Sequence, residues 1–412
     1  MNNNDKKIVR NLAGQYYNIA MSDKNAEKVK LYKAVNDLKM IRPVVLIDEI
    51  PWHQMNFNGE LNLECSDGGL RGLEHFFRYQ LFKHKYLDTD MYLTPYFSVG
   101  KRVHHSGIGI GVEERTLAAD PGNYIVSHEY VDKLKTEEDI EKLHNKTLTY
   151  DKEATEKYFS YVSDIIGDIL PVKITGHNVG MGLTAWDIIS MLKGVTNLLI
   201  DLAESPEFMH KIMRKLTDIY IDEVRQCEEL NLFAVDYPYI HCAPAFTNDL
   251  EPVTDFDNIK PKNVWGRGVA QIFGAVSKEM HDEFDTQYMI EALKPFGLIY
   301  YGCCEPLDTK IDILSQIKNL RKISITPLAD INRAAEAIGK DYVLAFKPNP
   351  ANVGVGFNED TVRKELSEAA EAAKKNSCSF DIVLKDISTV AGKPEHLIKW
   401  SQIAMEVAQN FL

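Results

Sequence analysis

The chain has 412 residues, 45 % of them hydrophobic and 26 % charged, with a formal net charge of −13. This composition is ordinary for a globular protein with a large core and argues against disorder. The acidic balance argues against non-specific nucleic-acid binding, because an acidic surface and a phosphate backbone repel each other. The sequence contains no run of about 18 apolar residues, so we expect no membrane-spanning helix.

The chain begins with a polar, charged segment, residues 1–10, so we expect no signal peptide. Its six cysteines are too few and too scattered for a disulfide framework. Both features predict a cytoplasmic protein, in a reducing compartment where free thiols can act as ligands.

Residues 1–40 are polar with spaced apolar positions and contain no Pro, and no Gly after Gly14. This pattern predicts a helical extension that packs on a main domain, residues 41–412. The main domain opens with a short apolar run at 43–47, which is typical of a strand buried on both faces. Residues 52–120 are irregular and rich in Gly, His and aromatics; such segments are often functional, and a surface insertion is the alternative.

Helical and strand-like segments then alternate to the end of the chain. This alternation predicts parallel strands joined by helical crossovers, in a barrel or an open doubly wound sheet. No GxGxxG follows the first strand, which weakens the dinucleotide-binding version. The expected strands are 170–175, 232–237, 269–275, 298–301, 322–325, 342–346 and 380–384, and the expected helices are 133–169, 183–193, two within 195–229, 277–294, 308–318, 330–339, 358–375 and 394–410.

Polar or metal-capable side chains follow most of these strands, and ligands meet the carboxyl ends of strands in such folds. Helix capping is the alternative. It explains Ser277 and Asp330 well, but not the cysteine and lysine pairs. The residues are Asp48, Glu49, Trp52 and His53; His177 and Asn178; Tyr239, His241 and Cys242; Gln271; Cys303, Cys304 and Glu305; Lys347; Lys385 and Asp386.

The pair Cys303-Cys304 is the sharpest local signal. If the strand continues through it, one sulfur faces the mouth of the fold and the other packs outward. A thiolate at a strand end suits zinc, with Glu305 and His241 as further ligands and one position open for substrate. The alternative is that a free cysteine is only a small core residue, and no CxxC spacing supports zinc.

Charged residues at three other strand ends complete the candidate site. Asp48 and Glu49 could act as acid and base or anchor a cation; a solvated loop pair is the alternative. Lys347 and Lys385 could hold a carboxylate, and a salt bridge such as Lys385 with Asp386 is the alternative.

Several stretches, in this order and spacing, resemble the uroporphyrinogen-decarboxylase-like superfamily, in particular its cobalamin-dependent methyltransferase branch. The likeness covers residues 195–410 well and 40–190 loosely. The stretches are Val264-Trp265-Gly266 to Gln271, Val276-Ser277-Lys278-Glu279-Met280, Phe296-Gly297-Leu298-Ile299-Tyr300-Tyr301-Gly302-Cys303-Cys304-Glu305-Pro306-Leu307, Lys322-Ile323-Ser324-Ile325-Thr326-Pro327, Lys347-Pro348-Asn349-Pro350-Ala351 and Leu384-Lys385-Asp386-Ile387-Ser388.

The resemblance implies a (β/α)₈ TIM barrel, zinc, a corrinoid (cobalamin) carried by a partner protein, and one-carbon chemistry on a small methyl donor or acceptor. Members often pair, which suggests a homodimer. The branch usually has His-x-Cys where this chain has Tyr301-Gly302-Cys303, and its later Cys, near Lys385, is also missing. A rebuilt zinc site would use Cys303, Cys304, Glu305 or His241. The acidic Asp48-Glu49 loop suits a polyanionic porphyrinogen poorly.

The sequence thus predicts a methyltransferase that moves a methyl group between a small methylated compound, or a thiol, and a corrinoid protein. Its expected catalytic residues are Asp48, Glu49, Lys385 and Asp386, and its expected substrate-binding residues are Trp52, His53, His177, Tyr239, Gln271 and Lys347. A metal-free decarboxylase or lyase of a small carboxylate is the alternative, and a binding protein without turnover is the third.

Overall fold

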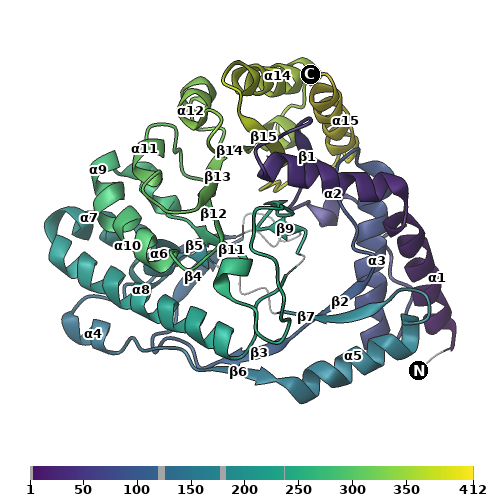
Figure 1. Ribbon diagram of the computed structural model, residues 1–412, viewed down its shortest axis with the longest axis horizontal. Helices are drawn as coiled ribbons and strands as arrows, with labels where there is room; N and C mark the ends of the chain where they lie inside the picture. The colour runs from purple at the N-terminus through teal and green to yellow at the C-terminus, as the bar shows by residue number, and fades with distance from the viewer. Residues whose placement is uncertain (1–2, 119–125, 177–181, 236, 412) are drawn as a thin grey trace.

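The computed structural model describes residues 3–118, 126–176, 182–235 and 237–411, and its centre is a parallel sheet (Figure 1). The order is β1-β15-β14-β13-β12-β11-β8, and every neighbouring pair is parallel. Its strands are β1 (Val44–Ile47), β8 (Gly182–Leu183), β11 (Trp265–Gly268), β12 (Leu298–Tyr301), β13 (Leu320–Ile325), β14 (Val343–Phe346) and β15 (Ser379–Leu384). A separate parallel pair joins β2 (Phe97–Gly100) to β7 (Val172–Thr175).

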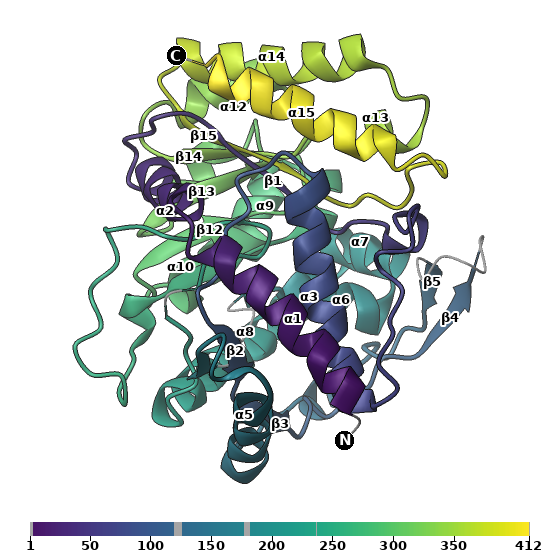
Figure 2. The ribbon, with the colours of Figure 1, turned by 90° about the vertical axis from the view of Figure 1, so that its right-hand side faces the viewer.

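Side chains alternate across the sheet, as its pleat requires. On β12, Leu298 and Tyr300 belong to one buried cluster with residues of β1, β14 and β15, while Ile299 and Tyr301 belong to the larger cluster that includes the helices. Helices α12 (Ile331–Ile338), α14 (Glu359–Lys375) and α15 (Glu395–Gln409) cover the outer face of the last strands (Figure 2). Inward-pointing side chains at the strand ends therefore share the inner face.

The N-terminal extension consists of two helices, α1 (Asn3–Ala20) and α2 (Asp23–Asn36). Helix α1 packs on α3 (Gly68–Tyr86) and α5 (Lys152–Ile166), and these helices bury a second apolar cluster around Tyr16 and Phe77 (Figure 2). Helix α2 instead contributes Tyr32 and Val35 to the cluster on the inner face of the sheet.

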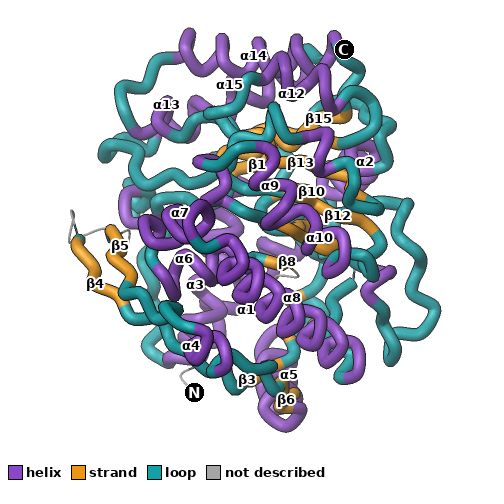
Figure 3. The backbone as a smooth tube through the Cα atoms, turned by 90° about the vertical axis from the view of Figure 1, so that its left-hand side faces the viewer, coloured by secondary structure: helices purple, strands orange, loops and turns teal. Residues whose placement is uncertain are grey.

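The remaining helices precede or connect the later strands. They are α4 (Glu137–Glu141), α6 (Ala185–Lys193), α7 (Val195–Glu204), α8 (Pro206–Glu229), α9 (Lys278–His281), α10 (Gln287–Ala292), α11 (Ile311–Leu314) and α13 (Ala351–Gly354). None of the helices in the described ranges is both long and apolar enough to span a membrane. The hairpin of β4 (Glu114–Leu117) and β5 (Ser127–Tyr130) projects from one side (Figure 3), and β3 (Arg102–His105) pairs with β6 (Leu148–Asp151).

A short hairpin fills the inner face of the sheet near the start of the strands. It consists of β9 (Tyr239–Ile240) and β10 (Ala243–Pro244). The carbonyl oxygen of Pro244 accepts a hydrogen bond from Lys322 Nζ at 2.9 Å, and that of Ala245 accepts one from Trp265 Nε1 at 2.8 Å. This hairpin therefore closes the inner face at that end and places His241 in its turn.

Four expectations for the elements are wrong. Residues 232–235 form no strand, and 271–275 form a 3₁₀ helix after the true strand, β11. The sequence of β11, Trp-Gly-Arg-Gly, does not look like a strand because it lacks β-branched residues. Close packing explains its glycines: a Cβ on Gly266 would lie 2.6 Å from Phe296, and one on Gly268 would lie 2.9 Å from Tyr301. Helix α3 lies within the segment expected to be irregular, and 133–169 contains β6 between two helices.

One ion pair is fully buried inside the sheet. Lys322 Nζ lies 2.8 Å from Asp381 Oδ2, and neither side chain is exposed. We expect Asp381→Ala to lower the free energy of unfolding by about 3–5 kcal/mol, because it leaves a buried ammonium without its counter-ion. Asp312→Ala, which breaks the exposed pair with Lys278, should cost less than about 1 kcal/mol. Urea titrations of both variants test this; equal losses would contradict it.

Candidate active site

The turn after β12 brings the two adjacent cysteines to the same spot. The strand ends at Tyr301, and Gly302 takes φ 95°, a conformation that favours glycine. Ser324 Oγ then donates a hydrogen bond to the Cys303 carbonyl at 2.9 Å. Because the strand does not continue through the pair, the sulfurs do not point to opposite faces, and the Sγ atoms lie 3.5 Å apart.

The end of β15 supplies a cation to both sulfurs. Lys385 Nζ lies 3.3 Å from Cys303 Sγ and 3.5 Å from Cys304 Sγ, and it also pairs with Asp386 Oδ2 at 2.8 Å. The Lys385 side chain is only 4 % exposed. The predicted Lys385–Asp386 salt bridge is thus present, and it forms part of the thiol cluster.

The end of β1 adds a carboxyl group. The Asp386 backbone N–H donates a hydrogen bond to Glu49 Oε2 at 2.9 Å. Burial and hydrogen bonding with Asp386 raise the pKa of Glu49, so Glu49 and Asp386 form a carboxyl pair that can exchange a proton. Asp48 is half-buried, and its backbone N–H donates to the Leu384 carbonyl at 2.9 Å.

His241 approaches from the β9–β10 hairpin. Its Nε2 lies 3.5 Å from Cys303 Sγ. Burial alone would lower the pKa of His241, but hydrogen bonds with Cys242 and Cys303 raise it to about 9. At neutral pH the imidazole is therefore a cation that faces the sulfur.

These contacts give the two thiols opposite charge states. The pKa of Cys303 falls to about 3, first because Cys304 donates a hydrogen bond to it, and also because His241 and the Lys385 ammonium stabilise the thiolate against the effect of burial. The hydrogen bond to Cys303 and burial raise the pKa of Cys304. Burial opposes the charge on Lys385, but the thiolate and Asp386 raise the pKa of its ammonium. Cys303 is accordingly a thiolate beside a neutral thiol.

Three side chains of the cluster sit on left-handed backbone. The φ angles are 51° at Glu49, 53° at His241 and 57° at Asp386. Non-glycine residues rarely adopt this conformation, and such strain gathers at functional sites. The surrounding fold thus holds these three groups in costly positions around the thiolate.

Glu305 anchors the cysteine turn. Its two carboxylate oxygens accept hydrogen bonds from the backbone N–H groups of Ala270 and Cys303, each at 3.0 Å, and its side chain is buried. Within the described ranges, no three His, Cys, Asp or Glu side chains are arranged to hold a metal ion. Since Glu305 is engaged and the Lys385 ammonium contacts both sulfurs, the residues as placed do not fit zinc.

No hydrogen bond joins Trp52, His53 or Gln271 to the two thiols among the described residues. Trp52 packs edge-on against Tyr79 of α3 with ring centroids 4.1 Å apart, and His53 is exposed. Gln271 is exposed and donates a hydrogen bond to Asp187 Oδ2 at 3.1 Å. The predicted His177 lies outside the described residues.

Lys347 belongs to a second buried group, together with Tyr300 and Cys242. It is 2 % exposed, its Nζ has no hydrogen-bond partner in the described structure, and it lies 5.8 Å from the ring centroid of Tyr300. Burial would raise the pKa of Cys242, but Lys347 and His241 lower it. Lys347 thus stabilises charge on Cys242, which shares His241 with Cys303.

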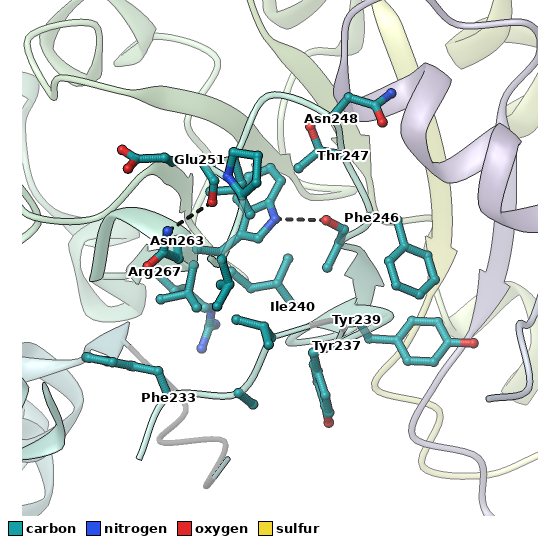
Figure 4. A pocket seen from close by; sticks show the side chains of 18 of the residues that line it. Phe233, Tyr237, Tyr239, Ile240, Phe246, Thr247, Asn248, Glu251, Asn263 and Arg267 are labelled. Atoms are coloured by element: carbon teal, nitrogen blue, oxygen red, sulfur yellow. Dashed lines mark hydrogen bonds between the residues drawn. The ribbon is translucent and has the colours of Figure 1, made fainter. Parts of the chain in front are cut away.

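A cavity of about 620 Å³ adjoins the cluster through His241 (Figure 4). Tyr239 lines it, but its hydroxyl turns away and accepts a hydrogen bond from the Tyr92 backbone N–H at 2.8 Å. Sequence reasoning missed this cavity and its arginine, Arg267. The only available signal was the density of aromatic residues between 231 and 265.

Comparisons with known proteins add little. No family model and no curated protein matches the chain. One similar solved structure is a methyltransferase from Methanosarcina mazei, which aligns over 93 % of this chain and 98 % of that chain with 11 % identity and a TM-score of 0.48. At this level of similarity, neither the fold nor the activity of this chain follows from the match.

Proposed function

We propose that the chain is an enzyme that transfers a methyl group between a small methylated compound, or a thiol, and a corrinoid protein. The observation that carries the proposal is the Cys303 sulfur, which lies 3.3 Å from the Lys385 ammonium and 3.5 Å from the His241 imidazole. Such surroundings hold a thiolate, the reactive form of cysteine. The order of sequence stretches shared with the corrinoid-dependent branch supports methyl as the transferred group.

The chemistry of the cluster suits displacement at a saturated carbon. The attacking atom supplies an electron pair, and the leaving atom keeps the pair of the broken bond. The Cys303 thiolate can supply such a pair, so that an S–CH3 bond forms as the bond between the methyl group and the donor atom breaks. In a second displacement the methyl group would pass to the reduced corrinoid of the partner protein, and Cys303 would leave with the electron pair as the thiolate that Lys385 and His241 stabilise. The His241 imidazolium, whose pKa is about 9, can give its proton to the leaving atom, and the Glu49–Asp386 pair can return a proton to the site.

A closed (β/α)₈ barrel is part of this proposal. The described strands β1, β2, β7 and β11 to β15 are eight parallel strands in chain order, which supports it. Contacts between β1 and β2, and between β7 and the edge of the sheet that β8 and β11 form, would complete the barrel. Its mouth would then collect the strand ends that carry Glu49, Cys303 and Lys385.

A zinc-assisted version would require the Lys385 ammonium to leave the two sulfurs. We therefore derive no step through a metal. Metal analysis of the purified protein tests this version, since bound zinc would have to displace Lys385, whereas full activity without metal supports the thiolate–lysine cluster.

A decarboxylase or lyase is the second candidate. The buried Lys347 ammonium, which has no hydrogen-bond partner among the described residues, favours it, because this cation could hold a substrate carboxylate in addition to stabilising charge on Cys242. This candidate expects Cys303→Ala and Cys304→Ala to retain activity and Lys385→Ala to lose it.

The experiment supplies the protein with methylated amines, thioethers and aryl ethers in turn, with reduced free cobalamin as surrogate acceptor. Formation of methylcobalamin, followed by its absorbance, is the expected result for at least one substrate class. Release of carbon dioxide from a carboxylate, without methyl transfer to cobalamin, would favour the second candidate.

A further inference from the structure

The cavity beside His241 has mainly aromatic and apolar walls. At about 620 Å³, it lies within the range of about 300–1,000 Å³ that small-molecule sites occupy. Tyr237 and Phe256 are 45 % and 62 % exposed. The aromatic residues that line the cavity are Phe233, Tyr237, Tyr239, Phe246, Phe256 and Trp265 (Figure 4). These walls suit an organic body of several carbon atoms.

One cation in this wall has no ion pair among the described residues. Arg267 lies two residues after Trp265 on β11 and lines the cavity, and its Nε is buried without a hydrogen-bond partner in the described ranges. The carboxylate of the cavity, Glu251, instead pairs with Lys262 at 2.6 Å. Burial raises the pKa of Asp187, and the charge of Arg267 acts against that rise; the Asp187 carboxylate accepts a hydrogen bond from Gln271.

A guanidinium whose buried Nε finds no hydrogen-bond acceptor among the described residues is costly unless a ligand supplies one. Its planar fork of N–H donors matches the two oxygens of a carboxylate. His241 lines the same cavity, and its Nε2 lies 3.5 Å from Cys303 Sγ. A molecule that fills the cavity and reaches Arg267 would therefore contact His241, the residue that faces the thiolate.

We infer that the substrate is an amphipathic carboxylate, whose apolar or aromatic body fills this cavity while Arg267 binds its carboxylate group. The inference rests on the proposed function, because it takes the cavity as the substrate site of the thiolate cluster. It narrows the substrate class from any small methylated compound to one with a separate anionic group.

The test uses 4-phenylbutanoate, its uncharged amide and its phosphonate analogue as probes, with affinity measured by isothermal titration calorimetry. We expect the carboxylate to bind the wild-type protein about tenfold or more tightly than the amide, as one charge-assisted contact predicts. Arg267→Gln should remove this preference and Arg267→Lys should retain part of it. Arg225→Gln, which alters an arginine on α8 paired with Asp222 and Glu229, should leave it unchanged.

Equal binding of carboxylate and amide, or a preference that survives in Arg267→Gln, would overturn the inference, and tighter binding of the phosphonate would overturn the carboxylate assignment. The wild-type comparison needs no variant, so a misfolded Arg267 variant does not weaken the test. Because the assay measures binding, its result is separate from that of methyl transfer. Cys303→Ser should bind the carboxylate as the wild-type protein does even though its transfer activity is lost.

Discussion

Cys303→Ser is expected to lower methyl transfer by about 10³-fold or more, as loss of a nucleophile does in other enzymes. A serine hydroxyl stays protonated at neutral pH, so the Lys385 ammonium and the His241 imidazolium would face a neutral group. The initial rate of methylcobalamin formation measures the effect.

Two matched variants sharpen this prediction. Cys304→Ser should retain much of the activity, because its hydroxyl can still donate the hydrogen bond that Cys304 gives to Cys303. Cys378→Ser changes a buried thiol that contacts the Ala335 carbonyl just before β15, at the opposite end of that strand from Lys385, and should keep activity if the protein folds. Full activity of Cys303→Ser would contradict the thiolate proposal and favour the lyase.

Lys385→Met is expected to raise the pKa of Cys303 by about two units or more. Opposite charges about 4 Å apart interact by about 4 kcal/mol at an effective dielectric constant of about 20, which corresponds to about three pH units. Asp386 balances part of the lysine charge, which reduces the shift. The increase follows from the sign of the charge, since removing a cation makes the thiolate harder to form.

Ultraviolet absorbance of the thiolate, titrated against pH and corrected with Cys303→Ser, measures this pKa. Lys318→Met, which removes a lysine for which no ion pair is described, is the control and should leave the titration unchanged. A titration in Lys385→Met that matches the wild-type curve would show that Lys385 does not stabilise the thiolate.

Much of the sheet could be predicted because its strands are buried on both faces. The runs at 43–47, 298–301, 342–346 and 380–384 are continuously apolar or nearly so, whereas 322–325 alternates polar and apolar residues; each overlaps an observed strand. The position of β11 was predicted wrongly because its glycines are required by close packing with neighbours distant in sequence, which no local pattern reveals.

Part of the candidate site could be predicted from the order of the strands. Parallel strands bring their final residues to one edge, so Glu49, Cys303 and Lys385 converge as expected. His241 was predicted to follow a strand at 232–237, but residues 232–235 form no strand. It reaches Cys303 from the turn of the β9–β10 hairpin on the inner face of the sheet. The role of Lys385 as the partner of both sulfurs, and the position of Arg267, depend on contacts across the fold that sequence spacing cannot reveal.

The most direct test of the thiolate is the pH dependence of iodoacetamide alkylation at Cys303 in the wild-type protein, read by peptide mass spectrometry. Absolute rates are uninformative, because nucleophilicity falls as the pKa falls and offsets the larger thiolate population. With a pKa of about 3, the rate should be nearly constant between about pH 5 and pH 8. A rate that rises about tenfold per pH unit toward pH 8.5, the behaviour of an ordinary cysteine, would contradict the account.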